Sequence, residues 1–66
     1  MNDYAFDFHL YTFPRPVQIG EWMVMKLEAK EHGWLKHMTP RFKSGMLTSI
    51  LFDNAEVAVA FKLIQE

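Results

Sequence analysis

The sequence predicts a small α+β domain in which one antiparallel or mixed sheet carries two helices, in the order β-α-β-β-α. Three observations support this class: alternating apolar residues at the start, a proline-free segment rich in helix-forming residues, and a later apolar run with β-branched residues after a turn. The chain has 66 residues and is 50% hydrophobic. This length holds a single domain, residues 1–66, whose core is small enough that a partner would help to stabilise it.

The first strand is predicted over residues 4–13, where apolar side chains occupy every second position. Its buried side would consist of Tyr4, Phe6, Phe8 and Leu10. Pro14 and Pro16 follow, and we expect them to end the strand because proline has no N–H for a sheet hydrogen bond. Pro16 would then be the first residue of the next helix, a position that proline favours.

The main helix is predicted over residues 17–32, and Gly33 is expected to end it in the left-handed conformation. At 100° per residue, one continuous apolar stripe runs along this helix, and we expect it to pack on the sheet. The stripe consists of Val17, Ile19, Gly20, Met23, Val24 and Leu27.

A second, smaller apolar cluster lies on nearly the opposite face of the same helix and consists of Trp22, Met25 and Ala29. Tryptophan is enriched at binding hot spots and methionine gives an adaptable surface, so we expect this cluster to contact a partner. The alternative is that the helix is buried on both sides, or that Trp22 packs against residues 33–42.

Residues 33–42 fit either a loop or an edge strand, because Pro40 is incompatible with a central strand. Lys43, Ser44 and Gly45 form a predicted turn within a hairpin that spans residues 41–52. The apolar run at residues 46–52 is the predicted central strand.

The C-terminal segment alternates like a strand but also repeats at helical spacing. Asp53 with Glu56 three residues later is typical of a helix N-cap and its partner, so we predict a second helix over residues 54–65. The complete order resembles a ferredoxin-like fold that lacks its last strand. Such a sheet has a free edge that could pair with another chain.

Composition excludes several classes of protein. The chain has no cysteine, so it has neither disulfides nor a thiolate metal site, and this favours the cytoplasm. We expect no signal peptide and no membrane span, because no apolar run approaches the required length. The net charge of -1 argues against a protein that is basic throughout.

No combination of residues indicates catalysis. Ser44 and Ser49 lie in a turn and an apolar run rather than in a nucleophile motif, and the three glycines are isolated. Glu28 and His32 stand one helical turn apart and, with His9 and His37, are the available metal ligands. We interpret Glu28 and His32 as an exposed pair at the helix end. We therefore expect no enzyme activity, cofactor, metal or small-molecule substrate.

Basic and aromatic residues alternate in one stretch, which is typical of single-stranded RNA or DNA binding. The residues that would bind are Trp34, Lys36, Arg41, Phe42 and Lys43. The alternative is that the two aromatic side chains belong to the core and the cations are merely solvated.

Residues 52–63 read Phe-Asp-Asn-Ala-Glu-Val-Ala-Val-Ala-Phe-Lys-Leu, and this segment resembles the end of small α+β accessory proteins encoded by tailed bacteriophages. The resemblance implies a strand that ends at Phe52, a helix packed on the sheet, and a role in the host cytoplasm through binding. Our leading hypothesis is therefore a protein-binding accessory or regulatory module, which includes a homodimer. The alternative hypothesis is a small nucleic-acid-binding protein.

Overall fold

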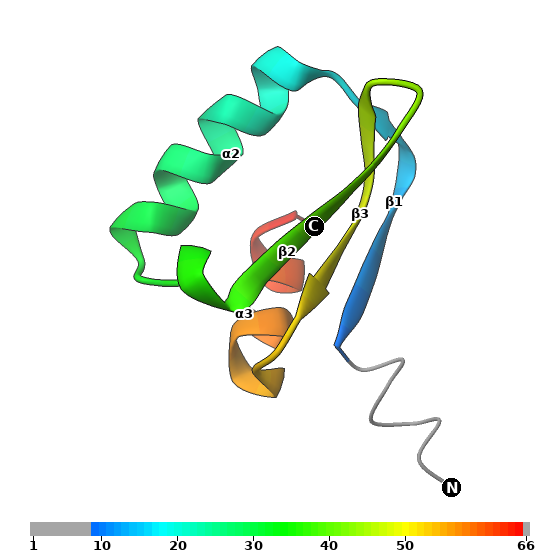
Figure 1. Ribbon diagram of the computed structural model, residues 1–66. Helices are drawn as coiled ribbons and strands as arrows, with labels where there is room; N and C mark the ends of the chain where they lie inside the picture. The colour runs from blue at the N-terminus through cyan, green and yellow to red at the C-terminus, as the bar shows by residue number, and fades with distance from the viewer. Residues whose placement is uncertain (1–8, 66) are drawn as a thin grey trace, which may run out of the picture.

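The computed structural model describes residues 9–65. Six elements follow one another: β1 (Leu10–Val17), α2 (Ile19–Glu31), a short 3-10 helix η1 (Leu35–His37), β2 (Met38–Lys43), β3 (Met46–Phe52) and α3 (Ala55–Gln65). The predicted order β-α-β-β-α is confirmed (Figure 1).

The three strands form one antiparallel sheet in the order β1-β3-β2. The chain leaves β1, passes through α2 to the far edge at β2, and returns between them as β3. The predicted central position of β3 is confirmed. Pro40 lies in β2, which is an edge strand, as the prediction for residues 33–42 allowed.

Strand β1 differs from the prediction. It begins at Leu10 and continues to Val17, so Pro14 and Pro16 lie inside the strand instead of ending it. The edge position tolerates them, because pairing with β3 is interrupted between Thr12 and Val17, where both prolines lie. Helix α2 consequently begins at Ile19, after the prolines. The part of the predicted strand that precedes His9 lies outside the described residues.

The hairpin between β2 and β3 has a two-residue turn, Ser44 and Gly45, with φ angles of 55° and 78°. Two positive φ angles in a two-residue loop define a type I′ turn, whose twist matches that of the flanking strands. The predicted turn is therefore present, with a serine in a position where asparagine or glycine would be more favourable.

A bulge at Thr48 changes the side of the sheet that the following side chains of the central strand β3 face. Ser49 pairs with Arg41 whereas Leu47 pairs with Phe42, so Thr48 is an extra residue opposite β2. Leu47 and Ile50 are three residues apart and would face opposite sides of a regular strand, yet both are 0% exposed. The bulge brings both side chains to the helix side.

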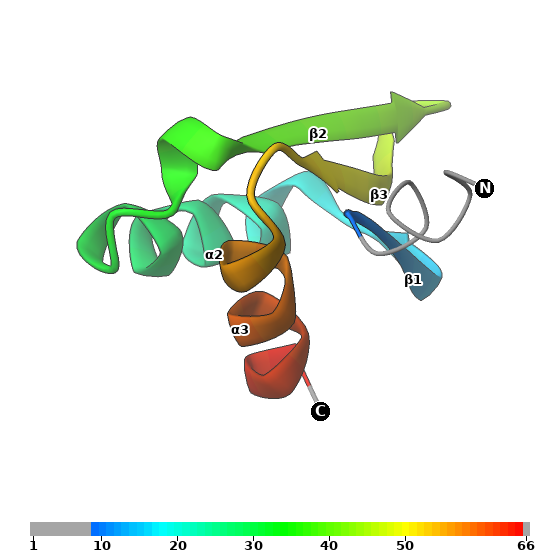
Figure 2. The same cartoon turned by 90° about the horizontal axis from the view of Figure 1, so that it is seen from below.

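Both helices lie on one side of the sheet, and α3 runs crosswise to α2 (Figure 2). Phe61 of α3 is at the centre of the core, with its ring 5.8 Å from Tyr11, 6.4 Å from Phe13 and 5.5 Å from Phe52, measured between centroids. Around it the core consists of Phe13, Val17, Trp22, Ala29, Met38, Leu47, Ile50, Phe52, Ala58 and Phe61.

Gly33 ends α2 as predicted. It has φ of 76°, its N–H donates to Lys30 O (3.1 Å), and the Trp34 N–H donates to Ala29 O (2.9 Å). These two hydrogen bonds form a Schellman motif.

The start of α3 differs from the prediction, because Asn54 rather than Asp53 is the cap. The Val57 N–H donates to Asn54 Oδ1 at 3.1 Å. Asp53 instead contacts the last residue of η1: its Oδ1 is 2.7 Å from His37 Nδ1, and its N–H donates to His37 O at 3.1 Å.

Candidate interaction surface

The predicted contact cluster is in the core, so the prediction that it faces a partner is wrong. Trp22 is 5% exposed and Ala29 is 1% exposed, and Met25 is half-buried against the core. The Trp22 ring meets the Phe42 ring edge-on with 6.5 Å between centroids, which corresponds to the packing alternative for Trp22. These residues of α2 face the sheet and α3.

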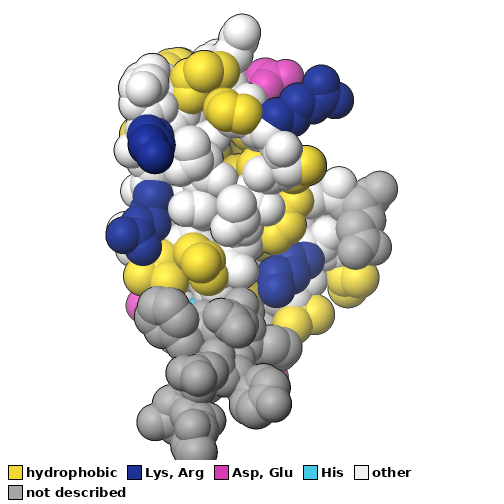
Figure 3. All heavy atoms as spheres, turned by 90° about the vertical axis from the view of Figure 1, so that its right-hand side faces the viewer, with side chains coloured by type: hydrophobic (Ala, Val, Ile, Leu, Met, Phe, Trp, Pro, Cys, Tyr) yellow, Lys and Arg dark blue, Asp and Glu magenta, His cyan; other side chains and the backbone are white. Residues whose placement is uncertain are grey.

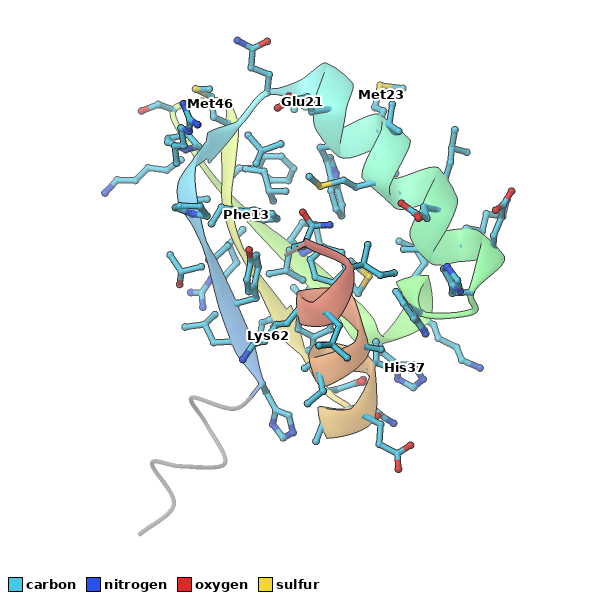
Figure 4. All side chains as sticks on the ribbon, turned by 180° about the vertical axis from the view of Figure 1, so that it is seen from behind. Phe13, Glu21, Met23, His37, Met46 and Lys62 are labelled. Carbon is cyan, nitrogen blue, oxygen red and sulfur yellow. The ribbon has the colours of Figure 1, made fainter. Side chains whose placement is uncertain are left out.

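Of the stripe predicted to pack on the sheet, Val17 lies in β1 and is buried, whereas the large apolar residues in α2 face outward instead. Ile19 is 47% exposed, Met23 56%, Val24 66% and Leu27 66%. We call these four residues the outer face of α2. Figure 4 shows Met23 projecting away from the sheet, whereas Phe13 points toward α3. No described residue covers this face.

The buried and exposed sides of α2 are the reverse of the prediction, and the physical cause is side-chain volume. Trp22 is the largest apolar side chain in α2, and its burial beside Phe42 removes more apolar surface from water than any other residue of the helix could. Ala29 is small enough to let α2 approach α3, where it lines a narrow cavity with Trp34 and Phe61. The opposite stripe offers no comparable pair of large and small residues.

Charged side chains border the outer face of α2 on both sides. Lys26 and Lys30 lie on the side toward β2, where Lys26 borders a shallow apolar groove with Pro40 and Phe42. Glu21 and Glu28 lie on the other side, toward β1 and α3. All four are exposed. At 100° per residue, Lys30 falls between Ile19 and Met23, and Glu31 falls between Leu27 and Val24. The outer face is therefore an apolar strip that is interrupted by one cation and one anion near the C-terminal end of α2.

A second apolar surface lies on α3. Val59 is 38% exposed and Leu63 66% exposed, and they line a shallow depression with Ala55, Glu56 and Ala60. This surface has fewer large side chains than the outer face of α2.

The residues predicted for nucleic-acid binding do not share one surface. Phe42 pairs with Leu47 on the helix side of the sheet, whereas Arg41 and Lys43 lie on the far side, because alternate residues of a strand face opposite ways. Trp34 is half-buried and stacks on His32, with 4.3 Å between ring centroids.

Lys36 lies in η1, before β2, and is exposed. Figure 3, which looks onto the β1 side, shows Lys and Arg side chains that stand apart from one another. The stacking faces and the cations of this stretch are thus separated.

The two sheet edges are poorly suited to pairing with another strand. Pro14 and Pro16 lie in β1 and Pro40 lies in β2, and proline on an edge strand removes hydrogen-bond donors and blocks edge-to-edge association. Strand β1 is also irregular between Thr12 and Val17. Contact through a helix face is therefore favoured over the predicted contact through a sheet edge.

Within residues 9–65, no group of three or more His, Asp or Glu side chains is placed to hold a metal ion. His32 stacks on Trp34, and His37 lies beside Asp53 near the start of α3 (Figure 4). Ser44 is in the turn, and Ser49 faces Thr12 and Arg41 across the sheet. In the same part of the chain, no helix is both long and apolar enough to cross a bilayer.

Comparison with models of protein families, with curated protein sequences and with solved structures found no match to this chain. The proposals below therefore rest on the residues and the geometry described above.

Proposed function

We propose that this chain acts by binding protein, as a small accessory or regulatory module without catalytic chemistry of its own. The observation that carries the proposal is the outer face of α2, where four large apolar side chains are 47–66% exposed in one strip. Burying such a strip is favourable at about 25 cal/mol per Å². The largest contiguous apolar patch on the surface of a small protein is often its functional contact surface.

The contact surface is therefore moved from the predicted cluster to the opposite side of α2. Trp22 and Ala29 are buried on the core side of α2 and hold the helix against the rest of the domain. The similarity of residues 52–63 to phage accessory proteins supports a role in a host cytoplasm, where such a module would act on a partner by occupying its surface.

The test is affinity capture from the native cell lysate, with nuclease, comparing two double variants with the parent chain. Val24→Ser with Leu27→Ser removes the outer face of α2 and should abolish capture of the partner. Val59→Ser with Leu63→Ser removes an exposed apolar pair from α3 and is the matched control, which should retain the partner. Circular dichroism should show both variants folded, because all four positions are exposed.

Equal capture by the parent chain and the α2 variant would overturn the assignment of the surface. Capture that disappears when nuclease is added would favour the second function instead.

The second function is binding of single-stranded nucleic acid, and one observation supports it. The three strands contain Arg15, Arg41 and Lys43 but no acidic residue, and Arg41 and Lys43 share the far side of the sheet with Ser49 and Thr39. Phosphate contacts would come from these cations, and affinity would fall steeply with salt. Replacing Arg41 and Lys43 with Ser should then abolish retention of a single-stranded oligonucleotide in a low-salt filter assay. No retention by the parent chain would end this second proposal.

A further inference from the structure

We infer that the part of the outer face of α2 nearest β2 binds an acidic amphipathic helix of another protein, which lies in the groove between α2 and β2. This inference rests on the proposed protein-binding function and names the chemistry of the partner. It follows from the lining of the groove and from the charges of its two walls.

The groove has an apolar floor and an apolar rim. Its described lining is apolar except for one lysine, and consists of Ile19, Trp22, Met23, Lys26, Leu35, Met38, Pro40 and Phe42. Trp22 and Met38 are buried and form the floor. Ile19 and Met23, which belong to the outer face of α2, are exposed on one rim, and Phe42 is exposed on the other. Apolar side chains of a partner would be buried favourably here.

The wall formed by α2 is basic. At 100° per residue and counted from Trp22, Lys26 and Lys30 stand at about 40° and 80°, on the flank that borders the groove. The acidic residues of this helix stand between about 180° and 260°, and they are Glu21, Glu28 and Glu31. The flank of α2 toward the groove therefore carries two cations and, among the described residues, no anion.

The opposite wall, formed by η1 and β2, has no acidic residue either. It belongs to residues 33–52, which contain no Asp or Glu. Lys36 adds an exposed cation next to Leu35. Asp53 follows this segment, and its Oδ1 is 2.7 Å from His37 Nδ1. Cations thus stand on both walls although the net charge of the chain is -1, so the complementary partner has apolar side chains flanked by Asp or Glu.

A helix suits this groove better than a strand. Pro40 lies in the edge strand β2, and proline on an edge disfavours the addition of another strand. A helix satisfies its own backbone hydrogen bonds. The groove extends about 10 Å along α2 from Ile19 to Lys26 and about 14 Å along β2 from Met38 to Phe42. Two to three turns of an amphipathic helix, with apolar residues three or four positions apart, have this length.

Single-stranded nucleic acid is the other polyanion that these cations would attract. It needs ring faces on which bases stack. Trp22 is buried, so its ring is not free to stack, and Phe42 is the remaining ring of the described lining. The aliphatic side chains of the rim favour a protein partner.

Three peptides of about 14 residues test the chemistry of the partner. They share Leu at helical spacing and differ in the flanking positions, which are all Glu, all Gln or all Lys. At low salt we expect the Glu peptide to bind at least about tenfold more tightly than the Lys peptide, with Gln between them and with a smaller difference at high salt. In a nuclear magnetic resonance titration, the signals of Ile19, Met23 and Phe42 should shift, whereas those of Val59 and Leu63 should not.

Two double variants locate the charges that recognise the partner. Lys26→Glu with Lys30→Glu reverses the charge of the α2 wall and should make the Lys peptide the tightest binder. Arg41→Glu with Lys43→Glu makes the same change in formal charge on the far side of the sheet and is the matched control, which should still prefer the Glu peptide. All four positions are exposed, so circular dichroism should show both variants folded.

Equal affinity for the three peptides, or no binding of any of them up to about 1 mM, would overturn the inference. An oligonucleotide that binds more tightly than the Glu peptide and is lost in Lys26→Glu/Lys30→Glu would assign the groove to nucleic acid instead. Concentration-dependent shifts of the groove residues in the free chain would assign it to a second copy.

The affinity capture described above separates this inference from the proposed function. Capture that is lost in Val24→Ser/Leu27→Ser but unchanged in Lys26→Glu/Lys30→Glu would uphold protein binding and refute an acidic partner.

Discussion

Replacing Trp22 tests the orientation of α2 directly, because two opposite assignments of this residue predict different outcomes. If Trp22 faces outward, Trp22→Ala changes association but not stability. The structure places its side chain in the core, 5% exposed and against Phe42. Truncating a buried Trp destabilises a protein by about 3–5 kcal/mol. A chain of this length has a total stability of roughly 3–10 kcal/mol, so the variant should lose between about a third and all of it.

Leu27→Ala is the matched comparison on the same helix. Leu27 is 66% exposed, and an exposed substitution of this kind changes stability by less than about 0.5 kcal/mol. Trp22→Phe is an intermediate variant: it keeps a ring against Phe42 and should lose only part of the stability. The expected order of stability is parent, Leu27→Ala, Trp22→Phe, Trp22→Ala.

Urea denaturation followed by far-ultraviolet circular dichroism measures this order, with every variant at the same protein concentration. Circular dichroism is preferable to fluorescence because the substitution removes one of the two tryptophans. Equal loss of stability in Trp22→Ala and Leu27→Ala would refute the orientation of α2 and, with it, the assignment of the outer face.

Three further predictions concern local structure and are measured by the same denaturation assay. Ser44→Asn should stabilise the chain by about 0.5–1 kcal/mol, because Asn tolerates the positive φ of a type I′ turn better than Ser; no gain would argue against that turn. Asn54→Ala should cost about 1 kcal/mol through loss of the α3 cap, whereas an unchanged midpoint would show that the cap contributes nothing. A double-mutant cycle with His37→Ala and Asp53→Ala should give a coupling below about 1 kcal/mol, since Asp53 is 72% exposed; a larger value would contradict an exposed pair.

Elements determined by local chemistry could be predicted from the sequence. Gly33 ends α2 because glycine accepts a positive φ without strain, and this holds in any tertiary context. The turn at Ser44 and Gly45 and the apolar run that follows are similarly local, so the hairpin and its central strand were correct. Local signals also distinguished helix from strand at the C-terminus.

Features that depend on position within the sheet could not be predicted. Pro14 and Pro16 normally end a strand, but here the strand is an edge, its pairing is interrupted, and no ladder donor is lost. The bulge at Thr48 likewise depends on the partner strands. Asp53 and Asn54 are both good caps, and the choice between them was made by His37, sixteen residues away, which contacts Asp53.

The side of α2 that would be buried was undetermined for a different reason. Apolar residues lie on both sides of this helix, so periodicity alone cannot say which side packs on the sheet. Side-chain volume determines which side is buried, because the large indole of Trp22 packs beside Phe42. Five of the thirteen residues of α2 are charged, so its outer side can face water, and the four apolar side chains there are left uncovered by the described residues. The ambiguity about the core side and the exposed apolar strip therefore have one origin, which is that α2 carries large apolar residues on both of its sides.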